Sequence, residues 1–323
     1  FRRRVLEALH GAERLSDGAF RVIGAIADVS HYVREGSAID AAGLERCTSI
    51  YLPDRVIPML PHELSSNLAS LVPDEDRLTL AVEVTVGPRG AVQGHRFIEG
   101  VMRSRARLSY GGVARALGMT DAPERQEAAE RHRELLRTLF DVSLVLRANR
   151  RKRGGLDFDL PEAEVVLDAT GEPLDVRRSR TDPGVRKAYG MIEDLMLLAN
   201  EVTAADLARR NVPAIYRIHG PPNEQKIEAF ASLAESLGYP FDPDQRAIAG
   251  FLRKVEGSEH AQALSFLLLR AMQQATYDTT NIGHFALAAT HYLHFTSPLL
   301  RCPALAVHRI VRAIARGERL DEM

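Results

Sequence analysis

The sequence predicts an α+β fold, with strands mainly in the first third of the chain and long helices after it. Segments 20–29 and 77–86 are continuously apolar or alternate between apolar and polar residues, which is the pattern of β-strands. After about residue 121 the apolar residues recur at helical spacing instead. Because no internal repeat or low-complexity linker interrupts the 323 residues, we expect one domain over residues 1–323.

The expected strands are bounded by turn residues. A turn at residues 17–18 precedes segment 20–29, and a Gly-Pro-Arg-Gly turn over 87–90 follows segment 77–86. Since segment 95–108 comes soon after that turn, we expect it to pair with 77–86 as a hairpin.

The expected helices are indicated by capping residues as well as by apolar spacing. Asp121, with a proline two positions later, predicts a helix that runs to about Asn149. Ser297 followed by Pro298 predicts the start of the last helix, which should run to Ala315. The other elements expected in this region are strands over 154–168, 174–179 and 212–219, and helices over 185–209, 223–237, 244–255 and 260–274.

Composition limits the class of protein. An apolar fraction of 45% and a charged fraction of 26% are typical of a soluble globular protein. No apolar run approaches the ~20 residues of a membrane span, so we expect no membrane association. The two cysteines, Cys47 and Cys302, are far apart in sequence and form neither a disulfide framework nor a zinc spacing. They favour a reducing, cytoplasmic location.

The charge pattern is ambiguous about nucleic acid. The net charge of −1 does not by itself predict nucleic-acid binding. Basic residues nevertheless cluster within 103–107, 147–153 and 177–180, where they would neutralise a phosphate backbone locally. The alternative is that these clusters are solvated helix ends and loops.

Six segments carry a resemblance to a known family, and they occur in that family's order. They are residues 51–65, 97–110, 156–168, 191–201, 216–230 and 281–298, and the longer stretches 25–61 and 281–309 carry the same resemblance. Together they resemble the catalytic RNB domain of the ribonuclease II and ribonuclease R family. That family degrades single-stranded RNA from the 3′ end with magnesium, so the resemblance implies an RNB fold and single-stranded RNA as a partner. The family's cold-shock and S1 modules are not found within these residues.

The resemblance also implies residues that contact RNA. Tyr51 and Phe158 match aromatic residues that grip the last bases by stacking, which suits binding without sequence preference. Tyr110 matches another tyrosine associated with substrate. The alternative for all three is an ordinary core aromatic. The remaining RNA-binding candidates lie in retained motifs and are Glu193, Asn281, His284 and Arg301. For Glu193 a structural role, and for His284 a role in the core, stay open.

The chemistry of the family is what the sequence lacks. The resemblance implies an aspartate cluster, D-x(5)-D-x-D-D, that holds magnesium, but the only acid ahead of segment 13–22 is Glu7. Glu7 lies beside Val5, Leu6 and Leu9, whose spacing predicts an amphipathic helical turn. No metal ligand is therefore predicted.

A second loss falls at residues 297–305, where the family has S-P-I-R-R-Y-P-D-L. Leu300 takes the place of the arginine that reaches the scissile phosphate, and Ala304 that of the aspartate. Cys302 replaces the tyrosine. Arg301 keeps the second basic position and is the one weak catalytic candidate.

Three functions stay open at this point. The first is an RNA-binding protein that holds single-stranded 3′ ends in a deep groove, with nuclease activity lost or strongly impaired. The second is an active 3′→5′ exoribonuclease that releases nucleoside 5′-monophosphates, its aspartate loop missing between Ala12 and Glu13. Magnesium is expected as a cofactor only in this second case. The third is a regulatory or scaffolding protein that reuses the fold.

Overall fold

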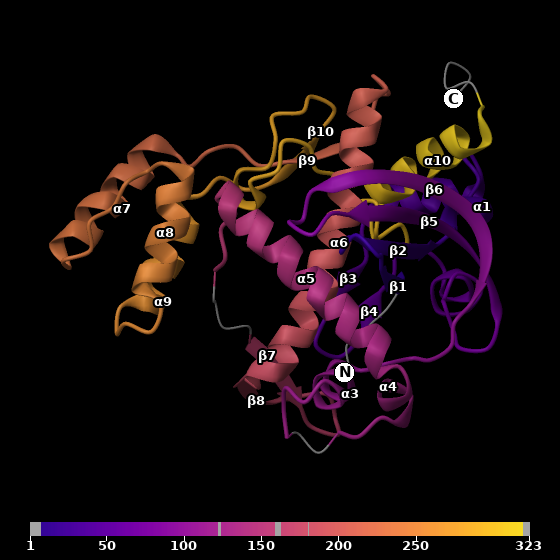
Figure 1. Cartoon of the computed structure of the whole chain (residues 1–323), viewed down its shortest axis with the longest axis horizontal. Coiled ribbons are helices and arrows are strands. Elements are labelled where there is room, and N and C mark those ends of the chain that lie inside the picture. The colour runs from indigo at the N-terminus through magenta and orange to yellow at the C-terminus, as the bar shows by residue number, and fades with distance from the viewer. Residues whose placement is uncertain (1–7, 122–123, 159–162, 180, 319–323) are drawn as a thin grey trace. The chain divides into compact units, whose positions relative to one another are not determined.

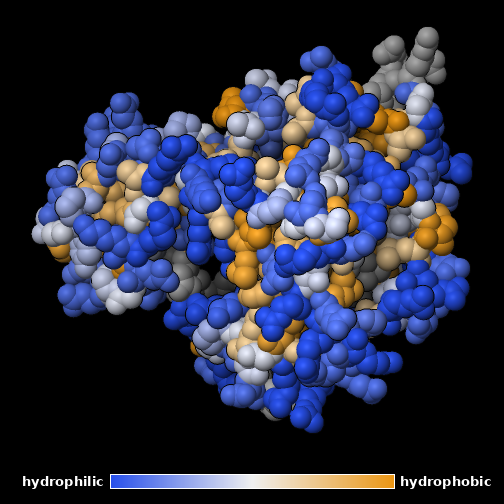
Figure 2. All heavy atoms as spheres, viewed as in Figure 1, coloured by the Kyte–Doolittle hydropathy of each residue, from blue (hydrophilic) through white to orange (hydrophobic). Residues whose placement is uncertain are grey.

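The computed structural model describes residues 8–121, 124–158, 163–179 and 181–318 (Figure 1). The chain divides into two compact units. The first consists of residues 1–146, 163–202 and 294–323, and the second of residues 147–162 and 203–293. Within the described ranges, no helix is both long enough and apolar enough to span a bilayer. Figure 2 shows hydrophilic side chains over most of the visible surface, with apolar patches between them.

A four-stranded antiparallel sheet lies in the first unit, and it confirms the α+β prediction. Its strand order is β1-β2-β5-β6. The strands are β1 (Ala8–Arg14), β2 (Phe20–Ala27), β5 (Asp76–Val86) and β6 (Val92–Arg103). The expected hairpin of segments 77–86 and 95–108 is confirmed as β5 and β6, with Val82 opposite Phe97. Of the ten strands in the described residues, six precede residue 104, as the sequence predicts.

The prediction of a helical turn near the start of the chain is wrong for the residues from Ala8 onward. Residues 8–14 form β1, whose whole length pairs with β2. Ala12 lies opposite Val22 and Glu13 opposite Arg21, so both belong to one uninterrupted strand. The backbone ladder with β2 outweighs local helical spacing here. Glu7, Val5 and Leu6 lie outside the described residues.

Helix α10 (Cys302–Arg316) is the last helix, and it starts later than expected. The Leu300 amide donates to the Ser297 carbonyl at 3.1 Å. Residues 297–300 therefore form a turn, where the sequence predicted the first turn of the helix. Arg301 is then extended, with φ −148° and ψ 127°. The predicted start at Ser297 is therefore wrong, and Pro303 rather than Pro298 occupies the first turn.

The helix predicted from Asp121 begins at Glu127 instead. It is divided into α4 (Glu127–Arg131) and α5 (Arg133–Arg153). Just before α4, the Gln126 side chain accepts from the Ser109 amide at 2.9 Å and donates to the Arg107 carbonyl at 2.8 Å. These bonds hold Gln126 extended, so the helix cannot begin earlier.

The other elements of the first unit are short apart from one helix. They are α1 (Val29–Tyr32), α2 (Ala38–Arg46), β3 (Ile50–Tyr51), β4 (Val56–Ile57), the π-helix η1 (Leu64–Leu68), α3 (Tyr110–Ala116), β7 (Ala163–Leu167), β8 (Pro173–Arg178) and α6 (Pro183–Arg209). The β7–β8 hairpin and α6, whose last turns enter the second unit, were expected from the sequence. Helix α2 was not expected; the Ser37 hydroxyl caps it by accepting from the Asp40 amide.

The second unit is built on three helices and a two-stranded ribbon. The helices are α7 (Glu224–Ser236), α8 (Gln245–Val255) and α9 (Ala261–Ala271), and the ribbon pairs β9 (Tyr216–Ile218) with β10 (Thr276–Asp278). The three predicted helices are confirmed. Their core is centred on Phe230, Phe251 and Leu268. A 3₁₀ turn, η2 (Phe285–Leu287), lies in the segment that follows β10.

Candidate functional site

Tyr51 lies on the β3–β4 hairpin, and it is exposed. Its accessible fraction is 60%, so the alternative of a core aromatic does not apply to it. Its strand is attached to the segment before α10, because Thr48 forms an antiparallel bridge with Arg301 and the Ser49 amide donates to the Leu300 carbonyl at 3.0 Å. The structure therefore brings the Tyr51 hairpin and the 300–301 segment together across the sequence.

Arg301 is held by a histidine that the sequence did not indicate. Its guanidinium Nη1 lies 2.9 Å from the His294 ring nitrogens. The side chain of Arg301 is half-buried, just ahead of the first turn of α10. This pairing fixes the direction of the one cation that remains in the 297–305 motif. A signal for His294 existed in its motif, since it precedes Phe295-Thr296-Ser297, but nothing there indicated an arginine partner.

Leu300 and Ala304, where the sequence predicts that family residues are lost, are both removed from full solvent contact. Leu300 is half-buried and packs against an apolar cluster that contains Val29, Met59 and Leu305. Ala304 is fully buried, and its amide donates to the Arg301 carbonyl at 3.1 Å. A charged group in place of Leu300 would meet these apolar neighbours.

Carboxylates in the described ranges are possible metal ligands. Among the residues of these ranges, no group of three or more His, Cys, Asp or Glu side chains is placed to hold a metal ion. The buried carboxylate of Asp28 serves its own helix start instead: it accepts from the Ser30 hydroxyl at 2.6 Å and from the His31 amide at 3.1 Å.

Ion pairs fix α10 in the first unit. Arg309 bonds to Asp40 at 2.6 Å, and Arg316 bonds to Glu99 at 2.7 Å. Burial opposes ionisation of Asp40, but Arg309 and the Gly36 amide outweigh it, so the pKa of Asp40 is lowered. The hydrogen bond from Arg316 likewise lowers the pKa of Glu99. Both carboxylates are therefore structural anions.

Tyr110 contacts the part of α6 that carries Glu193. Tyr110 begins α3 and packs against Tyr189, with ring centroids 5.0 Å apart and planes tilted by 57°. Tyr189 and Glu193 are four residues apart on α6 and so share one face of it. Glu193 is exposed, whereas the adjacent Asp194 is only 3% exposed. The sequence did not single out Tyr189 or Asp194.

Phe158, Asn281 and His284 lie in the second unit. Phe158 is half-buried and packs against the apolar core of α7, α8 and α9, so a packing role for it is observed. Asn281 closes its own loop: its side chain donates to the Thr290 carbonyl at 2.8 Å and accepts from the Gly283 amide at 3.0 Å. Their roles toward RNA stay predictions.

His284 stacks on His219, a residue that the sequence did not select. The ring centroids are 5.0 Å apart and the planes differ by 19°. The Tyr292 ring approaches His284 edge-on at 5.3 Å. Burial lowers the pKa of His284 to about 4, with further contributions from His219 and Arg217. The pair is thus a set of neutral aromatic rings at neutral pH.

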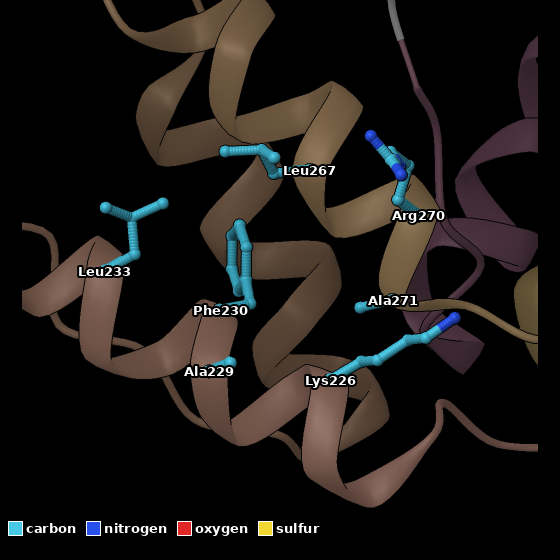
Figure 3. A pocket seen from close by; sticks show the side chains of 7 residues that line it. All are labelled: Lys226, Ala229, Phe230, Leu233, Leu267, Arg270 and Ala271. Atoms are coloured by element: carbon cyan, nitrogen blue, oxygen red, sulfur yellow. The ribbon is translucent and has the colours of Figure 1, made fainter.

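A hollow of about 330 Å³ opens between α7 and α9 (Figure 3). Phe230, Leu233 and Leu267 give it an apolar lining. Figure 3 shows the ammonium of Lys226 and the guanidinium of Arg270 on the side away from Leu233. Among the described residues, no carboxylate pairs with either cation. An apolar groove with two cations that pair with no carboxylate can accept apolar groups that lie next to an anion.

The basic clusters are partly neutralised. Arg103 pairs with Asp76 at 2.7 Å, Arg177 with Asp175 at 2.7 Å, and Arg151 with Asp157 at 3.2 Å. All three pairs are largely solvent-exposed, which makes each of them weak and salt-sensitive. The clusters therefore carry less free positive charge than the sequence indicates.

Comparison with known proteins agrees with the order of motifs. The chain matches the RNB domain family over residues 3–317. It is 39% identical over 314 residues to ribonuclease R of Aquifex aeolicus, covering 96% of this chain and 44% of that protein. It is 38% identical over 312 residues to ribonuclease R of Escherichia coli K12, covering 95% and 38%. The chain thus spans less than half the length of these two relatives.

Solved structures agree. Mycoplasma genitalium ribonuclease R, in complex with ribose-methylated single-stranded RNA, superposes with a TM-score of 0.89 at 30% identity, covering 99% of this chain and 50% of that one. Yeast Ssd1, described as a pseudonuclease, shares the fold with a TM-score of 0.76 at 19% identity, covering 97% and 38%. On the matched residues, the order of motifs and the fold, this chain belongs to the RNB domain family of ribonucleases II and R.

Proposed function

We propose that this RNB domain binds the 3′ ends of single-stranded RNA and that its nuclease activity is lost or strongly impaired. The RNA part is supported by family membership and by the exposed ring of Tyr51, since an accessible aromatic can stack on any base. A relative at 30% identity, the Mycoplasma ribonuclease R, is described with single-stranded RNA bound. Tyr51, Tyr110, Phe158, Asn281, His284, Glu193 and Arg301 are the residues proposed to meet RNA.

The observation that carries the loss of activity is the packing of Leu300. Its position is that of a family arginine, and here it lies against the apolar cluster of Val29 and Met59. A leucine offers no donor to a phosphate, and the loss of one transition-state donor costs about 10²–10³ in rate. Arg301 is occupied with His294, and Ala304 is buried.

The alternative is an active 3′→5′ exoribonuclease. It requires carboxylates from outside the described residues, because those within them form no cluster for magnesium. A segment inserted between Ala12 and Glu13 would interrupt β1, so this bond is a poor place for such residues. The alternative also leaves Leu300 unexplained.

The experiment uses the whole chain and a single-stranded RNA that has a free 3′ end and a fluorescent label at its other end. Anisotropy with EDTA present measures affinity at two salt concentrations, and separation of products after incubation with magnesium measures cleavage. The proposal expects binding that weakens with salt and no nucleoside 5′-monophosphate. Release of monophosphates would establish the active alternative, and absence of binding would overturn the RNA assignment. A DNA strand of the same sequence serves as the comparison.

A second candidate function is docking of a protein segment, and the groove between α7 and α9 favours it. Apolar side chains flanked by Lys226 and Arg270 suit an amphipathic peptide with a carboxylate beside its apolar face. A synthetic Leu- and Glu-containing helical peptide should bind, and one with Lys in place of Glu should not. Equal affinity for both peptides would remove this candidate. So would an unchanged affinity for the Glu-containing peptide in the double variant Lys226→Glu and Arg270→Glu.

A further inference from the structure

The two cysteines of the chain are neighbours in space. Cys47 ends α2 and Cys302 begins α10. The Cys302 amide donates to the Cys47 carbonyl at 2.9 Å, and the adjacent bridge joins Thr48 to Arg301 in antiparallel register. The two cysteines therefore flank that bridge, one residue outward on each segment.

This placement fits the geometry of a disulfide. A backbone hydrogen bond between residues of two antiparallel segments leaves their Cα atoms about 5.5 Å apart, within the ~4.4–6.8 Å that a disulfide spans. The Cys302 Sγ donates to the Gly43 carbonyl at 2.9 Å, and the same carbonyl accepts from the Cys47 amide at 2.8 Å. Both cysteines therefore meet at one carbonyl in the last turn of α2.

The backbone of Cys47 is unusual for a residue with a side chain. Its φ is 59°, in the region where glycine is the default. A Cβ in this conformation is unfavourable, yet here it carries a thiol next to the only other thiol of the chain. We find no packing role for it, because the residue is exposed.

The two thiols differ in access. Cys47 is exposed, whereas Cys302 is buried and touches the Met59 sulfur at 3.6 Å. Burial and then the neighbouring Cys47 raise the pKa of Cys302 to about 12, so it is almost wholly a thiol at neutral pH. Cys47 is thus the sulfur that a reagent reaches first, and Cys302 is the sulfur that follows.

We propose that Cys47 and Cys302 form a reversible disulfide by exchange with a small-molecule disulfide, and that this bond locks the segment carrying Leu300 and Arg301 onto the end of α2. The Tyr51 hairpin follows directly from Cys47, so the bond joins two parts of the candidate site. The disulfide itself does not depend on RNA binding, and its test is independent of the proposed function.

The reaction proceeds in two exchange steps. The Cys47 thiolate attacks one sulfur of the small disulfide, forms a mixed disulfide and releases one small thiolate, which takes up the proton that Cys47 lost. Cys302 then loses its proton to solvent and attacks the Cys47 sulfur, which releases the second small thiolate; that thiolate is protonated. The two cysteines are oxidised and the small disulfide is reduced to two thiols. Because Cys302 holds its proton tightly, the second step should accelerate as pH rises.

The test treats the folded whole chain with oxidised glutathione, quenches with an alkylating reagent and maps tryptic peptides by mass. Trypsin should free residues 47–55 and 302–309, each beginning with one of the cysteines. We expect these two peptides linked, with the loss of two hydrogens, and separated again by a reductant. This measurement uses the unaltered protein, so it does not depend on whether a variant folds.

Two single variants test the two exchange steps separately. Cys302→Ser should stop at a stable mixed disulfide on Cys47, and Cys47→Ser should react several-fold more slowly than wild type because Cys302 is buried. Accumulation of the mixed disulfide in the unaltered protein, with Cys302 still open to alkylation after denaturation, would overturn the proposal. Equal rates for the two single variants would overturn the assigned order of attack.

Discussion

His219 and His284 lie face to face in the second unit, and each uses its Nδ1 atom to accept a backbone hydrogen bond. The Ala286 amide donates to His219 at 3.2 Å and the Leu287 amide donates to His284 at 3.3 Å. A nitrogen that accepts carries no proton, so protonation would break these bonds and place like charges 5.0 Å apart. The stack is therefore compatible only with neutral rings.

Acid should destabilise the protein through this pair. The folded pKa of His284, about 4, lies below its ordinary value of 6.5. The stabilising contribution is therefore complete above about pH 6.5 and is lost as the pH falls toward 4. His284→Asn keeps an acceptor for the Leu287 amide but cannot titrate, so the loss of unfolding free energy between about pH 7.5 and 5 should shrink by about 1–2 kcal/mol. Urea unfolding of both proteins at pH 7.5 and pH 5 measures this difference in unfolding free energy.

The control for this prediction is His62→Asn, which removes an exposed histidine of the first unit. Some pH dependence should survive in His284→Asn, since burial also lowers the pKa of His308 to about 4. An unchanged pH dependence in His284→Asn would show that the stack is not its source.

Tyr51→Ala should weaken RNA binding with little effect on folding. The ring is 60% exposed, so its removal leaves no cavity, while one lost base stack costs about 1–3 kcal/mol. The dissociation constant for a short single-stranded RNA should rise roughly 5- to 100-fold. Tyr51→Phe should keep the affinity, and Leu44→Ala, which removes another exposed apolar side chain, is the matched control. Unchanged affinity in Tyr51→Ala would remove this residue from the RNA site.

Leu300→Arg should destabilise the protein without restoring cleavage. The new guanidinium would enter the apolar cluster around Val29 and Met59, at a cost of about 1–3 kcal/mol. Leu300→Met, which conserves volume, should cost less than about 1.5 kcal/mol. Thermal unfolding and a magnesium-dependent cleavage assay are the measurements. Cleavage by Leu300→Arg would mean that the carboxylates for magnesium are present elsewhere in the chain.

Asn200→Ala should unfold at a clearly lower temperature. The Asn200 Oδ1 atom accepts from the amides of Phe295 at 2.8 Å and Thr296 at 3.1 Å, and all three residues are buried. The truncation leaves two buried amides without an acceptor, which should cost about 2–4 kcal/mol. The exposed Asn67→Ala is the control. If the two variants melt together, Asn200 is not what fixes the segment ahead of α10.

The fold was predictable wherever local pattern and tertiary structure agree. Helices α7, α8 and α9 follow their apolar spacing, and the first two also follow their caps, because Asn223 and Asp244 do accept from the amides of the first turn. The start of the chain was not predictable in this way. The spacing of Leu9 suits a helix or a strand, and only pairing with Ala25 on β2 decides between them.

The candidate site shows the same division. Tyr51 and Arg301 could be selected as candidates because they lie in motifs, but the bridge that joins their segments is a tertiary contact. His294 and Tyr189 were missed because an arginine partner and a ring contact leave no signal in a single sequence. The distance of Cys47 from Cys302 along the chain argued against a link between them, whereas a backbone hydrogen bond joins the two residues in the fold.

The ion pairs that hold α10 in place involve other residues than the 297–305 motif. Arg309, Arg312 and Arg316 reach Asp40, Asp28 and Glu99, and none of the six belongs to the 297–305 motif. Substitutions in the motif therefore leave these three ion pairs in place. Variants of the motif should keep α10 docked, so their binding and cleavage can be compared on one common scaffold.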